Sequence, residues 1–246
     1  MKRSIGTWLA VAVAALPLAA QAQSKGTGDF SVVGAEVNTG KPVETFKVGF
    51  PGADFGYDIS LSKTIDITPT FSLLWSYGGM TVYTPFGLGL SAPIRFELGK
   101  VGDGNLLFHV DPGIAIYFGP SICSGLSGLA LALCQEAGST IQVGVLNGTQ
   151  FAIAFPVGVV LGFPIKDVPG LEIGGGLDVQ LAAVVTSPFN FYIGPWAGPY
   201  VEYHFAKPAG LAIGLDTRFG AGINTASGYG TWFAFRVQGF VGYRLF

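Results

Sequence analysis

The sequence predicts an all-β fold, a closed antiparallel transmembrane β-barrel, from its composition and the spacing of its apolar residues. Hydrophobic residues fill 50% of the 246 positions and charged residues only 11%, which is too apolar for an ordinary soluble domain. Along most of the chain, apolar side chains alternate with small or polar ones, as in β-strands whose two faces differ. Open sheet edges are not tolerated in hydrocarbon, so such a sheet must close on itself.

Residues 1–22 are predicted to be a cleaved signal peptide. Two basic residues precede an apolar run at 5–18, and the run leads to an Ala-x-Ala cleavage site at 20–22. The run is shorter than the roughly 20 residues of a spanning helix, which disfavours a membrane anchor. Removing Lys2 and Arg3 leaves 11 basic against 15 acidic residues, a net charge of −4. This balance gives no reason to expect nucleic-acid binding.

The clearest alternation extends from Phe191 to Ile223. Odd positions from 191 to 205 carry apolar residues or proline, and the pattern resumes after a turn at 207–210. Each run matches the length of about 9–11 residues with which a tilted strand crosses a bilayer. The other strands are predicted from runs of the same period at 55–61, 67–77, 86–98, 106–118, 151–165, 171–185 and 232–246.

The predicted number of strands follows from the even strand number of single-chain bacterial barrels. Nine runs follow Thr45, whereas a single-chain bacterial barrel has an even number of strands. Residues 23–43 supply the tenth strand if Phe30–Val37 is one. Otherwise they form a tail or a plug, and residues 44–246 form the barrel. A hairpin signal at Asn147-Gly148 allows further strands. We therefore predict ten strands, with eight or twelve as alternatives.

Charged residues within the predicted strands lie on the small and polar face, which predicts a charged lumen. In a small barrel such groups usually pair with one another, because an unpaired charge in a dry interior is strongly disfavoured. The alternative is that they line a path for a solute. The predicted lumen-lining residues are Asp58, Arg95, Glu97, His109, Asp111, Glu172, Asp178, Glu202, His204, Asp216, Arg218, Arg236 and Arg244.

Prolines are unexpectedly frequent in the predicted strands, among them Pro93, Pro112 and Pro156. Proline donates no hydrogen bond to a β-ladder and is therefore expected at edges or bulges. A closed barrel has no edge. One hypothesis is a local break near Pro195 and Pro199 that opens the wall toward lipid, and simple bulging is the alternative.

The chain ends in Gly242-Tyr243-Arg244-Leu245-Phe246 after an alternating run. This segment resembles the C-terminal strand of bacterial outer-membrane β-barrels, which ends in an aromatic residue that the barrel-assembly machinery recognises. Tyr243 and Phe246 correspond to that assembly signal, although the two fall out of phase on an unbroken strand. Short turns alternating with longer loops fit the same class. The resemblance implies insertion in a bacterial outer membrane, in contact with its lipids.

Cys123 and Cys134 are the two cysteines of the chain, and both lie in the exported part. An oxidising compartment and close spacing predict a disulfide between them. The apolar stretch that they enclose, within the loop at 119–149, predicts a lid over the barrel mouth or a partner-binding surface. Without a supporting histidine cluster, neither a metal site nor a cofactor is expected.

Three functions are compatible with these features. The first is a narrow pore or passive carrier for small solutes, because ten strands leave more room than eight. The second is a non-transporting barrel with a structural, adhesive or partner-binding role that uses the Cys123–Cys134 loop. The third is a lipid-modifying enzyme that uses His109 with Asp111, or His204 with Glu202. Because no motif joins a nucleophile to a base, the sequence favours the pore or carrier and predicts no enzymatic activity.

Overall fold

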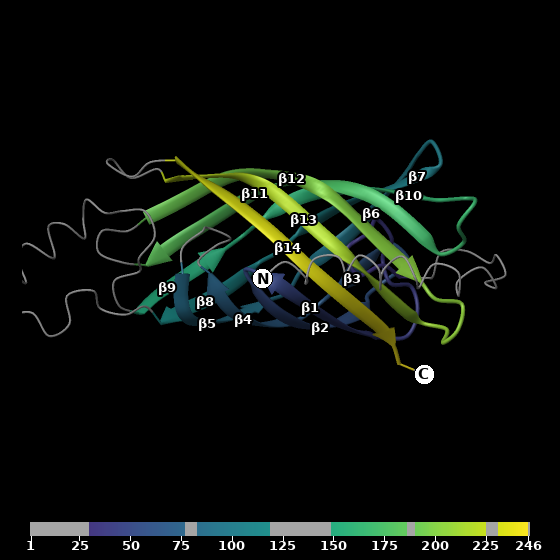
Figure 1. Cartoon of the computed structure of the whole chain (residues 1–246), viewed down its shortest axis with the longest axis horizontal. Helices are drawn as coiled ribbons and strands as arrows, with labels where there is room; N and C mark the ends of the chain where they lie inside the picture. Colours follow the sequence, from purple (N-terminus) through teal and green to yellow (C-terminus); the bar gives the residue numbers. More distant parts are fainter. Residues whose placement is uncertain (1–29, 77–82, 119–148, 186–189, 225–230, 246) are drawn as a thin grey trace, which may run out of the picture.

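The structure is a computed structural model, and within its described residues it is a closed antiparallel barrel of ten strands, as predicted (Figure 1). It describes residues 30–76, 83–118, 149–185, 190–224 and 231–245. The strand segments are β1 (Val43–Phe50), β2 (Gly52–Ser60), β3 (Ile65–Ile67), β4 (Thr70–Ser76), β5 (Tyr83–Ser91), β6 (Ile94–Val101), β7 (Gly104–Val110), β8 (Gly113–Phe118), β9 (Thr149–Ala154), β10 (Val157–Pro164), β11 (Leu171–Val185), β12 (Asn190–His204), β13 (Leu211–Asn224) and β14 (Thr231–Arg244).

These segments make ten barrel strands because four of the strands are interrupted once. The interrupted strands are β3 with β4, β5 with β6, β7 with β8, and β9 with β10. A proline stands at each interruption, and proline cannot donate to the ladder. Strand β1 pairs with both β2 and β14, and this pairing closes the barrel. The interrupting prolines are Pro69, Pro93, Pro112 and Pro156.

The tenth strand is not the one that the sequence suggested. Val43–Phe50 forms β1, whereas Phe30–Val37 belongs to no strand. A single residue, Pro51, separates β1 from β2, which is too short a connection to stand out in the sequence. Within β1, Thr45 is buried while Val48 is 45% exposed, the alternation that a two-faced strand requires.

Near Pro195 and Pro199 the pairing of β12 with β13 lapses, as the break hypothesis expects, although β12 itself is not interrupted. Both prolines stand inside β12, which is continuous from Asn190 to His204. The register between β12 and β13 skips the two prolines, and regular pairing resumes on either side of each. Among the described residues, strands divided into two segments are therefore confined to the opposite wall, from β3 to β10.

The two ends of the barrel differ in their connections. We call one the turn end; there short segments join β2 to β3, β6 to β7, β10 to β11 and β12 to β13, and the C-terminus lies beside them (right in Figure 1). The opposite end, where β4, β5, β8 and β9 meet the long strands, is the loop end. In outer-membrane barrels the short turns face the periplasm and the longer loops face outward.

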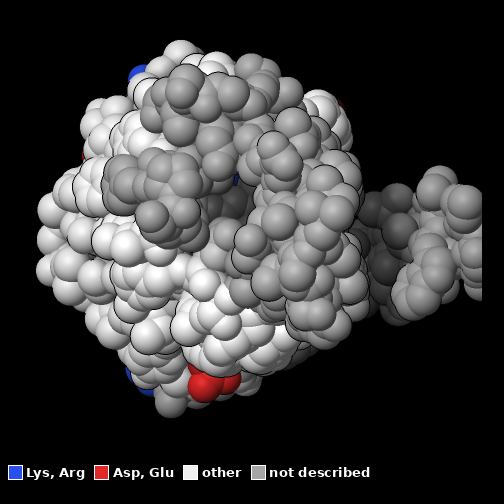
Figure 2. Space-filling view, turned by 90° about the vertical axis from the view of Figure 1, so that its left-hand side faces the viewer, with Lys and Arg blue, Asp and Glu red and all other residues white. Residues whose placement is uncertain are grey.

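Large apolar side chains cover the outside of the barrel. Examples are Leu90, Leu177 and Phe233, which are 57%, 55% and 59% exposed. Viewed from the loop end, the described surface shows little charge (Figure 2). An apolar outer band of this kind is what a bilayer solvates. No helix in the described residues is long and apolar enough to span a membrane.

Candidate functional site

The lumen contains three layers from the turn end to the loop end. Residues 30–38, which we call the plug segment, fill the turn end. A layer of ion pairs surrounds a polar cavity of about 190 Å³, and an apolar cavity of about 290 Å³ lies toward the loop end. Three residues line both cavities: Ser72, Ser91 and Asp111. The boundary between the cavities is therefore where a polar and an apolar environment meet.

Glu202, which is wholly buried in β12, anchors the plug segment. Its carboxylate accepts a hydrogen bond from the Ser31 hydroxyl at 2.8 Å and from the backbone N–H groups of residues 32–34 at 2.8, 3.2 and 3.3 Å. His204 Nε2 lies 3.1 Å from the same carboxylate. A buried carboxylate is very costly unless it is paired and hydrogen-bonded, so this arrangement fixes the segment in place.

Glu172 holds the next part of the plug segment. Its Oε1 accepts hydrogen bonds from the Ala35 N–H at 3.2 Å and from the Tyr200 hydroxyl at 2.5 Å. A Cβ at Gly34 would overlap both the Glu172 carboxylate and the Ser31 hydroxyl, so glycine permits this close approach. The apolar side chains of the segment pack against the barrel's inner face in two clusters. These contain Phe30 and Val32 with Val43, Ala212 and Phe240, and Ala35 and Val37 with Leu107, Val160 and Tyr200.

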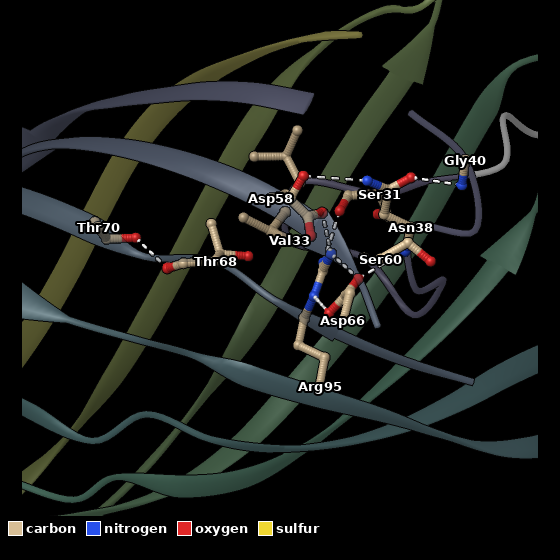
Figure 3. Close-up of polar contacts among 12 residues, drawn as sticks. Ser31, Val33, Asn38, Gly40, Asp58, Ser60, Asp66, Thr68, Thr70 and Arg95 are labelled. Carbon is tan, nitrogen blue, oxygen red and sulfur yellow. Dashed lines mark hydrogen bonds and ion pairs between the residues drawn. The ribbon is translucent and has the colours of Figure 1, made fainter. Parts of the chain in front are cut away.

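Arg95 joins the plug segment to the barrel wall (Figure 3). Its guanidinium donates to Asp66 at 2.9 and 2.5 Å, to Asp58 at 2.7 Å and to the backbone carbonyl of Ser31 at 2.6 Å. Asp66 in turn accepts the backbone N–H of Asn38 at 2.6 Å. The Arg95 charge is thus shared between two wholly buried carboxylates, which offsets the cost of desolvating all three groups.

A second set of charged groups forms an alternating chain in the middle of the lumen. His109 lies between Asp111 and Asp178, with Nδ1–Oδ1 and Nε2–Oδ1 distances of 3.0 and 2.8 Å. Arg218 continues the chain, at 3.3 Å from Asp178. The last two contacts join Asp216 to Arg218 at 2.5 Å and to Arg236 at 2.8 Å. We call these six residues, from Asp111 to Arg236, the ion-pair chain.

The two ends of the ion-pair chain are its more accessible members. The side chains of Asp178, Asp216 and Arg218 are 3% exposed, whereas that of Asp111 is 28% and that of Arg236 is 30% exposed. The Asp111 carboxylate thus faces the cavities, and Asp178 fixes the neighbouring His109 ring through its Nε2 atom. This arrangement can take up and return a proton at Asp111 without leaving a buried charge alone.

The apolar cavity is walled by aromatic and small side chains. Tyr117, Tyr192 and Trp196 supply the large surfaces, and alanines and glycines of β5, β8, β9 and β11 leave the space between them. Of the described residues that line this cavity, Asp111 alone carries a formal charge, and Gln180, Ser72 and Ser91 add polar groups. A mostly apolar cavity with a few convergent polar groups is the usual form of a small-molecule site.

The structure places eleven of the thirteen predicted lumen residues in two groups. The ion-pair chain contains six of them, and Asp58, Arg95, Glu172, Glu202 and His204 surround the plug segment. Glu97 and Arg244 lie toward the turn end, and both are half-buried. Arg244 also contacts the plug segment, with its guanidinium 4.8 Å from the centre of the Phe30 ring.

Several lumen residues were missed in the sequence. Asp66 lies in β3, just ahead of the strand that the sequence predicts from Ile67, although Ile65, Asp66 and Ile67 already alternate. Lys47 lies in β1, which was not recognised as a strand, and it lines the polar cavity beside Asp54. Trp196 and Tyr200 lie on the inward face of the clearest alternation. The spacing alone does not show that Tyr200 binds Glu172 or that Trp196 lines the apolar cavity.

Other predictions fall outside the described residues. They are the signal peptide at 1–22, the disulfide between Cys123 and Cys134, most of the loop at 119–149, and Phe246. Tyr243, the other half of the assembly signal, lies in β14 opposite Glu44 and Leu211. The described residues contain no group of three or more side chains suited to hold a metal ion.

Comparison with known proteins finds similarity in fold. No family model and no curated protein sequence matches the chain. Among solved structures, it is similar to the outer membrane protease OmpT from Escherichia coli, with 10% identity and a TM-score of 0.40 over 83% of this chain and 93% of that one. It is also similar to LpxR from Salmonella typhimurium, with 10% identity and a TM-score of 0.34 over 84% of this chain and 100% of that one.

The sequence-based expectation about function needs correction. The sequence favoured a pore or passive carrier, with a partner-binding barrel as the alternative, and predicted no enzymatic activity. That expectation is contradicted, and the first of the two similar solved structures is named as a protease. At 10% identity the likeness is one of fold, and it assigns no reaction or substrate to this chain. Independently, the plug segment occupies the turn end of the lumen, where a pore would be open.

Proposed function

We propose that the chain is an outer-membrane enzyme that hydrolyses an amphipathic molecule bound in the outer half of its lumen. The observation that carries this proposal is the position of Asp111. It lines both cavities, and of the described groups facing the apolar cavity it is the charged one. An amphipathic molecule would place its apolar part among Tyr117, Tyr192 and Trp196 and its polar part beside Asp111.

The chemistry follows from the neighbours of Asp111. Its carboxylate takes a proton from a water molecule directed at the polar bond, and His109, at 3.0 Å, stabilises the carboxyl group and shares the proton. Asp178 orients the imidazole from the other side, and Arg218 holds Asp178. The water oxygen bonds to the carbonyl carbon, the bond from that carbon to the leaving group breaks, and the proton passes from Asp111 to the leaving group. The hydroxyls of Ser72 and Ser91, which line both cavities, bind the polar part of the substrate.

Hydrolysis by the purified barrel tests this proposal. The substrates are chromogenic esters and amides with apolar chains of increasing length, presented in mixed micelles. We expect Asp111→Asn to lower kcat by about 10²–10⁴-fold, the contribution of general acid–base catalysis. His109→Gln should lower kcat less and shift its pH profile, because His109 acts through Asp111.

The matched control is Asp103→Asn, which removes a carboxylate from an exposed turn, 71% accessible and outside both cavity linings. Its rates should equal those of the unmodified protein. Hydrolysis that is no faster than in protein-free micelles, or that persists unchanged in folded Asp111→Asn, would refute the proposal. Folding of each variant is checked by its heat-dependent mobility on gels, a property of closed barrels.

Export and membrane insertion belong to the same proposal. Insertion into a bacterial outer membrane agrees with the closed barrel and its apolar outer band. Mass measurement of the mature chain tests the predicted cleavage after Ala22, because removal of residues 1–22 gives a defined mass loss.

A further inference from the structure

Four neighbouring strands of one wall are each interrupted by a proline at the same level. In the wall from β3 to β10 these are Pro69, Pro93, Pro112 and Pro156. Three hydrogen bonds connect them in a row: Thr68 N–H to Pro93 O at 2.8 Å, Ala92 N–H to Pro112 O at 2.9 Å, and Asp111 N–H to Pro156 O at 2.8 Å. In each case the residue before one proline donates to the proline of the next strand.

Each of these rungs is half made. Two opposite residues in such an antiparallel pair normally exchange two hydrogen bonds, but proline has no N–H and cannot return the second one. The register is otherwise continuous, since Val110 pairs with Val157 before the row and Gly113 pairs with Ala154 after it. The carbonyl groups of the residues that precede the prolines therefore lose their ladder donor. We call this line of rungs the proline row.

The described residues of the opposite wall have no row that crosses several strands, and their gaps in pairing lie between β12 and β13, at Pro195 and Pro199. Strands β11 to β14 contain 14 or 15 residues each without interruption. Their contacts with lipid demand complete backbone pairing, because the bilayer core offers no water as a substitute partner. The wall with the prolines also needs complete backbone hydrogen bonding, but the β-ladder does not provide it there because proline has no N–H. Among the described strands, incomplete pairs that are aligned across several strands at one level thus occur in the wall from β3 to β10.

The apolar cavity reaches the barrel wall at the proline row. Asp111 and Pro156 belong to the row and line the cavity. Leu90 and Ile114, register partners on β5 and β8, also line it, although they are 57% and 45% exposed on the lipid-facing side. On the lumen face this part of the wall bears small residues, among them Gly89, Gly113, Ala115, Ala152 and Ala154. Little more than backbone separates the cavity from lipid here.

We propose that the proline row is a lateral entrance through which an acyl chain of the surrounding membrane enters the apolar cavity. This inference rests on the proposed function and gives its substrate class: a membrane-embedded amphiphile with an acyl chain. The chain passes between β8 and β9, where the half-made rungs separate most easily. Its polar group then lies at Asp111, which is itself a member of the row.

Trp196 provides a direct reporter, because it lines the cavity and is only 6% exposed. The full chain, with Trp8, Trp75 and Trp232 replaced by Phe, is inserted into bilayers whose phospholipids carry bromine on their acyl chains. Bromine quenches tryptophan fluorescence on contact, so we expect at least a twofold loss of Trp196 emission relative to unbrominated lipid. Absence of quenching would overturn the proposal.

A disulfide staple across the row tests the route. Ile114→Cys and Ile153→Cys, register partners on β8 and β9, are combined with Cys123→Ser and Cys134→Ser. Oxidation should reduce the quenching at least fivefold, and a reductant should restore it. The control staple joins Ile213→Cys to Val241→Cys across β13 and β14, and it should leave quenching unchanged. Quenching that is equal in both stapled proteins means entry from the loop end and overturns the proposal.

Restoring the missing donors gives a second, independent test. Pro112→Ala with Pro156→Ala supplies N–H groups to the row, so quenching should fall and amide exchange on β8 and β9 should slow. Pro164→Ala, at the end of β10, is the control.

The quenching of Trp196 measures entry of an acyl chain into the cavity and does not depend on hydrolysis. If Asp111→Asn still quenches and the staple still blocks, while no ester is cleaved, the proposed function fails and the lateral entrance stands.

Discussion

The two halves of the lumen differ in how completely they are filled. At the turn end, the plug segment meets three buried carboxylates and Arg95, and its apolar side chains pack against the barrel's inner face. At the loop end, aromatic and small residues leave a cavity of about 290 Å³ with Asp111 at its edge. A barrel of ten strands is too wide for its own side chains to fill, so one half contains a piece of the chain and the other remains open to a ligand.

The wall of the barrel also has two parts, one of long strands and one of interrupted strands. The long strands β12 and β13 carry Glu202, Asp216 and Arg218, which hold the plug segment and the ion-pair chain. The interrupted strands border the apolar cavity and carry Asp111. Both kinds of strand line both halves of the lumen, and the proline row lies at the level where the halves meet: Thr68 and Pro93 line the polar cavity, and Asp111 and Pro156 line the apolar one. The following experiments challenge the contrast between the two halves, starting with the largest expected effect.

Deleting residues 30–38 should change the barrel from closed to conducting. The plug segment is then absent from the turn end, and the polar cavity connects to that side. We expect steady ion conductance in planar bilayers for the deletion variant and none for the full chain. Equal conductance of the two proteins would show that another part of the molecule closes the lumen.

Glu202→Ala should destabilise the barrel by about 3–5 kcal/mol, the usual cost of removing one partner from a buried ion pair. The change leaves His204 and the N–H groups of residues 32–34 without their acceptor. Urea unfolding followed by tryptophan fluorescence measures the loss. Glu44→Gln, on the outer face of β1, is the matched control and should unfold like the unmodified protein.

The same glycine substitution should have different effects in the two halves. At Gly162 a Cβ would overlap the Tyr200 hydroxyl and the Glu172 carboxylate, so Gly162→Ala should cost about 1–3 kcal/mol through overpacking. At Gly89, beside the apolar cavity, the nearest atoms are Ser72 Cβ at 3.2 Å and Leu74 Cδ1 at 3.6 Å. These contacts are longer than those at Gly162 but still tight, so Gly89→Ala should cost less unfolding free energy than Gly162→Ala, about 1 kcal/mol. Equal costs in urea titrations would contradict the contrast between a packed half and an open half.

The sequence predicted the barrel because alternation is a local property. The runs at 191–205 and 211–223 specify two faces without knowledge of any partner, and the inward charges follow from the same period. The contacts of these charges are not local. Glu202 and Ser31 are 171 positions apart, and Asp178 is 69 positions from His109. Only the closure of the barrel brings them together.

Two features of the site show why its three-dimensional arrangement could not be predicted from the sequence. Asp111 and His109 were paired from their spacing, but nothing in the spacing showed that Asp111 borders two cavities. The prolines at 93, 112 and 156 were visible, yet their alignment depends on the register of four strands. A plug segment without regular structure has no periodicity that could identify it. Its carboxylate partners are ordinary inward residues until the chain is folded.

The smallest effect is expected at the turn end's surface, where Lys166 Nζ lies 2.7 Å from Asp103 Oδ2 and both side chains are more than two-thirds exposed. The Lys166 hydrogen bond and charge lower the pKa of Asp103 below its ordinary value of 3.8, and Asp103 raises the pKa of Lys166. A lowered carboxyl pKa contributes stability near neutral pH, and this contribution is lost as the pH falls through the folded-state pKa. Because solvent screens the pair, Asp103→Asn should leave urea unfolding curves unchanged within error at pH 7 and at pH 3. A clear loss at pH 7 alone would show that the turns, and not only the plug segment, hold the closed half of the lumen together.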